Sequence, residues 1–222
     1  MPAPIDDLTT ATHAVANSLD RISNAIKQSA ERLRSDPKGF HHALRILFQT
    51  ADSPHGKFIF TGVGKSYLIG RKLAATWTSV GSRAMCVHST EALHGDLGIV
   101  SPGDCVIALS YSGNTEEVVR MVKAMRSGLR GESVGVSVVG VGRSSDSPLG
   151  MLSDAFIDGS VEGELSEAVS APTTSSSVTL AIGDAIAMLL MERRQFGPAD
   201  FARNHPGGNL GRVSREMSGQ EP

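Results

Sequence analysis

The sequence predicts a doubly wound α/β domain, in which helices flank a five-stranded parallel sheet and a helical extension precedes it. Beyond about residue 56, short and almost uninterrupted apolar segments alternate with amphipathic segments. This alternation is typical of parallel strands that are buried on both faces and of the helices that cover them. Each apolar segment also runs into a Gly- or Ser-rich turn before the next amphipathic segment begins, as strand-to-helix connections do.

Length and composition favour one ordinary domain. The chain has 222 residues, a charged fraction of 20% and a formal net charge of -2, which suits a single core and gives no basis for nucleic-acid binding. The N-terminus lacks the features of a secretion signal and no stretch resembles a membrane span, so we expect a cytoplasmic location and no membrane partner. Cys86 and Cys105 lie in apolar segments and are expected to be buried, free thiols.

Two helices are predicted before the sheet, within a unit that spans residues 1–56. Apolar residues between Leu8 and Arg34 recur at spacings of three, four and seven, which indicates an amphipathic helix. A second helix begins at Asp36-Pro37, and its buried side consists of Phe40, Leu44, Ile46 and Leu47. This unit packs either on the rest of its own chain or on a partner subunit.

The sheet domain is expected to span residues 57–212. Its predicted strands are 57–61, 84–88, 105–110, 134–139 and 155–157, and its predicted helices are 65–80, 90–97, 115–127, 147–152 and 175–193. From residue 196 onward the chain is rich in Gly and Pro, so we expect irregular structure that ends in a polar tail over residues 213–222. Sheets of this kind bind ligands beyond the carboxyl ends of their strands.

The motif TGVGKS at residues 61–66 follows the first strand. It is not a Walker A phosphate loop, because Ile59 occupies the position of that loop's first glycine. What remains is a tight turn into a helix whose first amides, together with Lys65, can face an anion. The alternative is an ordinary turn with a solvated lysine.

The motif SYSGNTEE at residues 110–117 follows the third strand. Three hydroxyls around one glycine, placed just before a helix, can bind phosphate through hydroxyl and backbone N–H donors. In the alternative interpretation, Thr115 only caps the helix.

Two histidines and two carboxylates occur in HSTEALHGD at residues 88–96. On a helix, Glu91 and His94 would share a face, as proton-transfer chemistry between them requires. A zinc site is a weaker alternative because no cysteine or HExxH spacing accompanies them, and we expect no metal. His205, in the rigid turn HPGG, is by itself a lone exposed histidine, and the hydroxyl run at residues 173–177 is expected to cap the last helix.

Taken in order, the motifs resemble the sugar isomerase (SIS) domain of D-arabinose 5-phosphate isomerases. They are GVGKS, EALHGDLG, SYSGNTEE, APTTS, GDAIA and HPGGNLGR, and the resemblance covers residues 40–212. It implies an aldose–ketose isomerase that needs no cofactor, usually a homotetramer whose active sites are shared between subunits. Most members continue into a pair of CBS domains after HPGG, whereas this sequence ends soon after it, so we expect no regulation through such domains.

The resemblance also implies roles for individual residues. The sugar phosphate would be held by Ser110, Ser112 and Thr115. Glu164 and Glu167 compete for the position of a second family glutamate, and we favour Glu167 because Ala168 follows it. The implied catalytic positions are Lys65, His94, Glu117, Glu167 and His205, the last from a neighbouring subunit. The further substrate-binding positions are Gly64, Ser66, His88, Gly113, Thr173 and Ser175.

The implied reaction interconverts D-arabinose 5-phosphate and D-ribulose 5-phosphate by moving a proton between C1 and C2 through an enediol. Glu117 or the second glutamate would be the base, a histidine would help to open the sugar ring, and Lys65 would fix charge. Two alternatives remain: a non-catalytic sensor of a sugar phosphate, and an isomerase of another phosphosugar. No helix-turn-helix pattern, which would favour a sensor, occurs in the first 56 residues.

Overall fold

The structure, a computed structural model, describes residues 7–127 and 135–218. Five strands form one parallel sheet in the order β2-β1-β3-β4-β5, which confirms the predicted fold class. The strands are β1 (Phe58–Gly62), β2 (Ala84–His88), β3 (Cys105–Leu109), β4 (Ser137–Gly142) and β5 (Ala155–Asp158).

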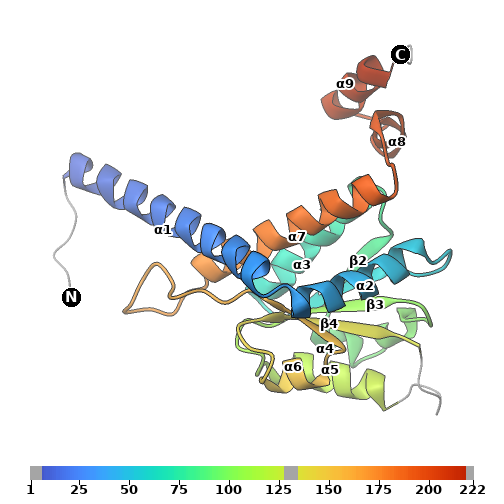
Figure 1. Ribbon diagram of the computed structural model, residues 1–222, viewed down its shortest axis with the longest axis horizontal. Helices are drawn as coiled ribbons and strands as arrows, with labels where there is room; N and C mark the ends of the chain where they lie inside the picture. The colour runs from blue at the N-terminus through green and yellow to red at the C-terminus, as the bar shows by residue number, and fades with distance from the viewer. Residues whose placement is uncertain (1–6, 128–134, 219–222) are drawn as a thin grey trace.

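Helices cover both faces of the sheet, so the domain has three layers (Figure 1). One face carries α1 (Leu8–Ser35), α2 (Lys38–Asp52), α3 (Lys65–Ser79) and α7 (Thr174–Arg193). The other carries α4 (Ser89–Ala92), the short 3-10 helix η1 (Asp96–Ile99), α5 (Glu116–Arg126) and α6 (Pro148–Leu152). The strands read as continuous apolar runs because their successive side chains enter two separate cores, one under each layer of helices.

Trp77 on α3 organises the larger core. Its ring meets Phe58 and Phe60 of β1 edge-to-face, at centroid distances of 4.9 and 5.0 Å. Its Nε1 donates a hydrogen bond of 2.9 Å to the carbonyl oxygen of Gly183 on α7. A Cβ atom at Gly183 would lie 2.5 Å from Leu73, so the glycine allows α3 and α7 to approach closely.

The fourth strand begins and ends later than predicted, and the predicted start at Val134 lies outside the described residues. Gly140 and Gly142, which read as a turn in the sequence, lie inside β4. A Cβ at Gly140 would be 2.5 Å from Ser153 Oγ, and one at Gly142 would be 2.3 Å from the Ser110 carbonyl oxygen. These glycines therefore reflect close neighbours rather than chain reversal.

The chain beyond residue 196 is not irregular, contrary to the prediction. It forms α8 (Pro198–Asn204) and α9 (Asn209–Ser218), and residues 219–222 of the predicted tail lie outside the described residues. Pro198 starts a helix rather than breaking one because it stands in the first turn, where its missing N–H is not needed. The Asp200 carboxylate accepts a hydrogen bond of 2.9 Å from the Gly197 amide and closes that turn.

The helix α7 is long and apolar enough, by length and composition alone, to cross a membrane, although the sequence analysis expected no such segment in the chain. The core accounts for one apolar side of this helix. Four that face the sheet and α3 are buried, namely Val178, Ile182, Ile186 and Leu190. The same composition suits a central core helix.

The buried side chains of α1 lie in its second half. Ala25 and Ser29 are buried there, whereas Leu8, Val15 and Leu19 in the first half are 83%, 62% and 62% exposed. The first half extends beyond the body of the fold (Figure 1). The N-terminal unit thus joins its own domain through its second half.

Both cysteines are free thiols, as predicted. Cys105 is fully buried in β3, and Cys86 in β2 is partly exposed. Burial raises the pKa of the Cys86 thiol to about 11, so this thiol is protonated and weakly nucleophilic at neutral pH.

Replacing Trp77 with Phe should test how α3 and α7 are joined. The change leaves the Gly183 carbonyl without its donor and opens space in the core, so we expect the free energy of unfolding to fall by about 1–3 kcal/mol. Urea unfolding followed by circular dichroism measures this. Leu68→Ala is the control, because Leu68 is 60% exposed on the same helix; equal losses in both variants would contradict the assignment.

Candidate active site

A cleft lies where the order of strands changes direction. From β1 the chain passes to β2 on one side and then to β3 on the other. The connections that leave the carboxyl ends of β1 and β3 therefore run in opposite directions, and a crevice lies between them. The first turns of α3 and α7 border this crevice. A cleft of about 40 Å³ there is lined by Lys65, Ser66, Ile69, Leu109, Ser110, Tyr111, Val141, Pro172, Ser175, Ser176 and Thr179.

The turn after β1 presents a cation and a helix N-terminus to this cleft. Gly64 caps α3 with φ of +59°, a left-handed conformation that favours glycine. Lys65, the next residue, is exposed and makes no hydrogen bond or ion pair within the described part of the chain. Because the first amides of a helix lack internal partners, this corner can bind an anion.

The loop after β3 places two hydroxyls together. Ser110 is 3% exposed, and its Oγ lies 2.9 Å from Thr115 Oγ1. Thr115 makes no side-chain capping bond to α5, so the alternative that it only caps the helix is wrong. Gly113, with φ of +69°, closes the loop where a Cβ would meet Ser147 Oγ at 2.0 Å. Ser112 is exposed, and its Oγ accepts a hydrogen bond of 3.2 Å from the Asn114 amide.

Glu117 lies in the first turn of α5, directly after this loop. Its side chain is partly buried and has no hydrogen-bond partner among the described residues. A carboxylate without competing partners is available to exchange a proton with a ligand.

Glu164, rather than the hydroxyl run, caps α7. Its Oε2 accepts hydrogen bonds from Thr173 N (2.7 Å), Thr173 Oγ1 (2.9 Å) and Ser175 N (3.3 Å), and its Oε1 accepts one from Ser175 Oγ. The predicted capping by side chains of residues 173–177 is therefore wrong, because the N-cap Thr173 makes no such bond itself. Ser175 is buried and also lines the cleft.

These contacts keep Glu164 ionised. Partial burial is the largest single influence and opposes ionisation, but the four hydrogen bonds together outweigh it and lower the pKa of the carboxyl below its ordinary value. A carboxylate held in this way is a weak base at neutral pH.

Glu167, which the sequence analysis favoured over Glu164, lies exposed in the loop before α7. It makes no hydrogen bond or ion pair with any described residue. Glu164, by contrast, reaches the first turn of α7 because the loop folds back on that helix.

His88 and His94 do not border this cleft. His88 ends β2, where its Nδ1 accepts a hydrogen bond of 3.3 Å from the Thr90 amide and its ring meets Tyr67 edge-to-face. It lines a separate cleft of about 560 Å³ with Glu91 and other residues. The predicted helix over 90–97 is interrupted after Ala92, so His94 lies in an exposed turn and does not share a helical face with Glu91.

The alternative of a zinc site gains no support from the arrangement of these side chains. Among the described residues, no three of His, Cys, Asp and Glu gather closely enough to hold a metal ion. Glu91 and Asp96 line the second cleft together with His88, but the three side chains do not form such a group.

His205 lies at the far end of α3 from Lys65. It follows α8, its ring stacks on Phe201 at 3.9 Å, and its Nε2 is 3.3 Å from the Oγ of Ser79, the last residue of α3. With a rise of about 1.5 Å per residue, α3 separates the two ends by about 21 Å. His205 therefore does not reach the cleft of its own chain.

Several residues of the cleft were not singled out from the sequence. Ser176 and Thr179 extend the hydroxyl surface of Ser175 along one face of α7, a pattern that the spacing of three and four residues could have revealed. The sequence motif SYSGNTEE includes Tyr111 but predicts no separate role for it. Its hydroxyl accepts a hydrogen bond of 3.3 Å from the Val161 amide and lies 3.4 Å from the Val161 carbonyl oxygen.

The capping role of Glu164 predicts a dependence of stability on pH. Because its pKa is lower in the folded than in the unfolded chain, its contribution is fully present above the ordinary glutamate pKa of about 4.3 and is lost as pH falls through the folded value. Glu164→Gln should lower the melting temperature at pH 7, and the difference from the unmodified chain should shrink below about pH 4.5. A difference that stays constant down to pH 3 in calorimetric melts would contradict this.

Comparisons with known proteins agree with this architecture. A family model described as SIS domain matches residues 53–189. A probable arabinose 5-phosphate isomerase of Haemophilus influenzae is 40% identical over 196 residues, which are 88% of this chain and 54% of that protein. The arabinose 5-phosphate isomerase KdsD of Pseudomonas aeruginosa is 40% identical over 200 residues, 90% of this chain and 57% of that protein.

The chain spans about half the length of these curated relatives. Among solved structures, c3406 of Escherichia coli CFT073 in complex with arabinose 5-phosphate superposes with a TM-score of 0.77 at 34% identity. That match covers 90% of this chain and all of the other. The chain belongs to the SIS domain family.

Proposed function

We propose that this chain is an aldose–ketose isomerase that interconverts D-arabinose 5-phosphate and D-ribulose 5-phosphate. The observation that carries the proposal is the meeting of Lys65, Ser110 and Ser175 around one cleft at the first turns of α3 and α7. The proposed substrate is taken from the names of the relatives. The six motifs, which occur in this chain in the same order, support the proposal of this particular sugar phosphate.

The phosphate of the substrate is proposed to occupy the loop at residues 110–115. Ser110, Ser112 and Thr115 can each donate a hydroxyl hydrogen bond, and the N-terminus of α5 favours the negative charge. Gly64, Ser66, Gly113, Thr173 and Ser175 would shape the surrounding surface. Lys65 would balance charge near the reacting end of the sugar.

The proposed chemistry is proton transfer without a metal ion or an organic cofactor. In the open-chain aldose, a base removes the proton from C2, the carbonyl oxygen on C1 is protonated, and a cis-enediol forms. Return of the proton to C1, with loss of the proton from the C2 hydroxyl, gives the ketose. A positioned base contributes about 10²–10⁴-fold to such a step.

Glu117 is the better candidate for the base. Glu164 is committed to four hydrogen bonds and its pKa is lowered, whereas Glu117 has no partner among the described residues. Glu164 then acts by holding the first turn of α7. Glu167, His94 and His88 stay as proposed contributors, and each would need a movement or a neighbouring subunit to reach the substrate.

His205 is proposed to act from a neighbouring subunit, in a homotetramer with shared sites. The length of α3 supports this, because it separates His205 from the cleft of its own chain. We infer a cytoplasmic location for the assembly.

A coupled assay with D-arabinose 5-phosphate and D-ribulose 5-phosphate, with and without EDTA, tests the proposal. We expect turnover in both directions that survives chelation. Loss of turnover on chelation would contradict the metal-free scheme. Absence of turnover with thermal stabilisation by either sugar phosphate would favour a sensor, and turnover of only another phosphosugar would favour an isomerase of different specificity.

Glu117→Gln tests the base. We expect kcat to fall at least about 10²-fold with little change in KM, because the amide keeps the shape of the side chain but accepts no proton. Glu116→Gln is the matched control: Glu116 is the neighbouring residue, is 80% exposed, and among the described residues forms an ion pair with Arg120 alone, on its own helix. Similar kcat values for both variants would reject Glu117 as the base.

A further inference from the structure

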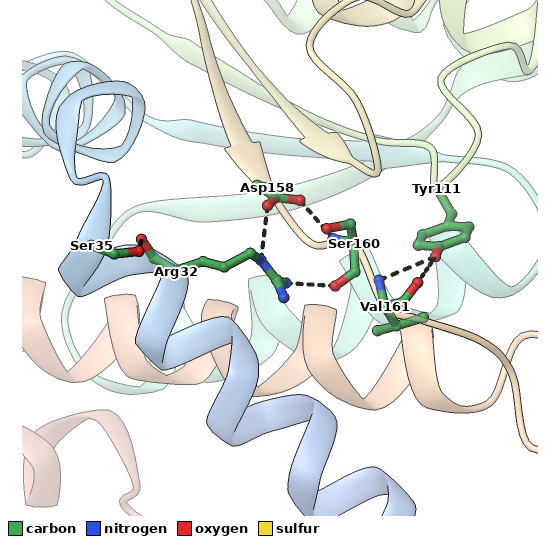
Figure 2. Close-up of polar contacts among 6 residues, drawn as sticks. All are labelled: Arg32, Ser35, Tyr111, Asp158, Ser160 and Val161. Carbon is green, nitrogen blue, oxygen red and sulfur yellow. Dashed lines mark hydrogen bonds and ion pairs between the residues drawn. The ribbon is translucent and has the colours of Figure 1, made fainter.

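A segment that connects β5 to the cleft runs along α1. We call residues 158–165 the strap. Arg32 forms an ion pair of 3.0 Å with Asp158 and donates a hydrogen bond of 2.6 Å to the Ser160 carbonyl oxygen. Figure 2 shows both contacts, together with those of Tyr111 to Val161 on the opposite side of the strap.

Two more residues of α1 hold the strap further along. Gln28 donates a hydrogen bond of 2.9 Å to Glu162 Oε1. Arg21 donates two, both of 2.9 Å, from Nη2 to the Glu164 carbonyl oxygen and from Nη1 to the Leu165 carbonyl oxygen. The three anchors are seven and four residues apart on α1, so they share one helical face. The strap runs antiparallel to α1.

Polar contacts, rather than close packing, hold this part of the strap. A cavity of about 200 Å³ lies between this part of α1, the strap and the start of α7, and is lined by Arg21, Gln28, Glu162 and Thr174 among others. The buried Oγ1 of Thr174 finds no hydrogen-bond partner within the described chain. The strap at Glu164 and Leu165 is thus held from two sides, by Arg21 of α1 and by Thr173 and Ser175 at the start of α7.

The last anchor lies directly behind the cleft wall. Arg21 binds the backbone carbonyl groups of the consecutive residues Glu164 and Leu165. The Glu164 carboxylate in turn accepts hydrogen bonds from Thr173 and Ser175. Ser175 lines the cleft. A continuous chain of hydrogen bonds thus leads from an exposed residue of α1 to the candidate site.

We propose that Arg21 is a positioning residue for this site: by fixing the backbone at Glu164, it sets the first turn of α7 and so the shape of the substrate cleft. The proposal rests on the proposed function. A planar guanidinium can serve two adjacent carbonyl groups at once, which the single ammonium of lysine cannot do with the same geometry. Since Arg21 is exposed, its loss should leave the fold intact.

The test compares Arg21→Gln and Arg21→Lys with Arg34→Gln. Arg34 lies exposed on the same helix, its side chain makes no hydrogen bond or ion pair with any described residue, and it so controls for the loss of charge. We expect both Arg21 variants to raise KM for D-arabinose 5-phosphate about five- to tenfold with kcat within about twofold. Arg34→Gln should change neither value, and all three melting temperatures should stay close to that of the unmodified chain.

Two further readouts separate positioning from general weakening. Hydrogen exchange in Arg21→Gln should accelerate in residues 160–176 and should not change in the five strands of the sheet. In a Ser175→Ala background, Arg21→Gln should raise KM by no more than about twofold, because the two changes act through one path. An unchanged KM in Arg21→Gln, rescue by lysine, or full additivity with Ser175→Ala would overturn the proposal.

Failure of the proposed function would be visible separately. If the unmodified chain shows no turnover, the inference is decided by thermal stabilisation with inorganic phosphate alone. A stabilisation midpoint raised at least about threefold in Arg21→Gln supports positioning. An unchanged midpoint overturns it.

Discussion

The parallel pairing of β1 with both β2 and β3 is the constraint on which the rest of the molecule depends. It puts the carboxyl ends of β1, β2 and β3 at one edge, and it makes the connections after β1 and β3 leave in opposite directions. Lys65 and Ser110, which are 45 positions apart in the sequence, become neighbours for this reason alone. The cleft is thus a result of topology before it is a result of any particular side chain.

Glu164 joins this sheet edge to the remainder of the structure. Its carboxylate completes the first turn of α7, where a helix otherwise leaves amides without partners, and its carbonyl group accepts from α1. One residue therefore links α1 and α7, two helices that are distant in the sequence. The matched family region begins at residue 53 and so omits α1, yet α1 supplies contacts to the strap that the matched region alone would lack.

The sheet could be predicted almost completely from sequence, because continuous apolar runs such as that of β3 have no other explanation in a chain of this composition. Gly140 and Gly142 misled the placement of β4, since a glycine required by a close neighbour looks the same in sequence as a glycine required by a turn. The loops that present Lys65, Ser110 and Thr115 were found from motifs. The sequence alone does not show which of Glu164 and Glu167 contacts the first turn of α7. That depends on the path of a long loop, which contacts α1 through Arg21.

The anchors on α1 also have a consequence for how the chain folds. Arg21 contacts residues 143 and 144 positions further along, and α1 otherwise packs mainly on α7. During synthesis from the N-terminus, α1 emerges long before either partner exists, and contacts at such separation are costly to close. The sheet can pair while the apolar side of α1 is still uncovered and open to association with other chains. The wall of the cleft at Glu164 can therefore form only after the first turn of α7 has been synthesised.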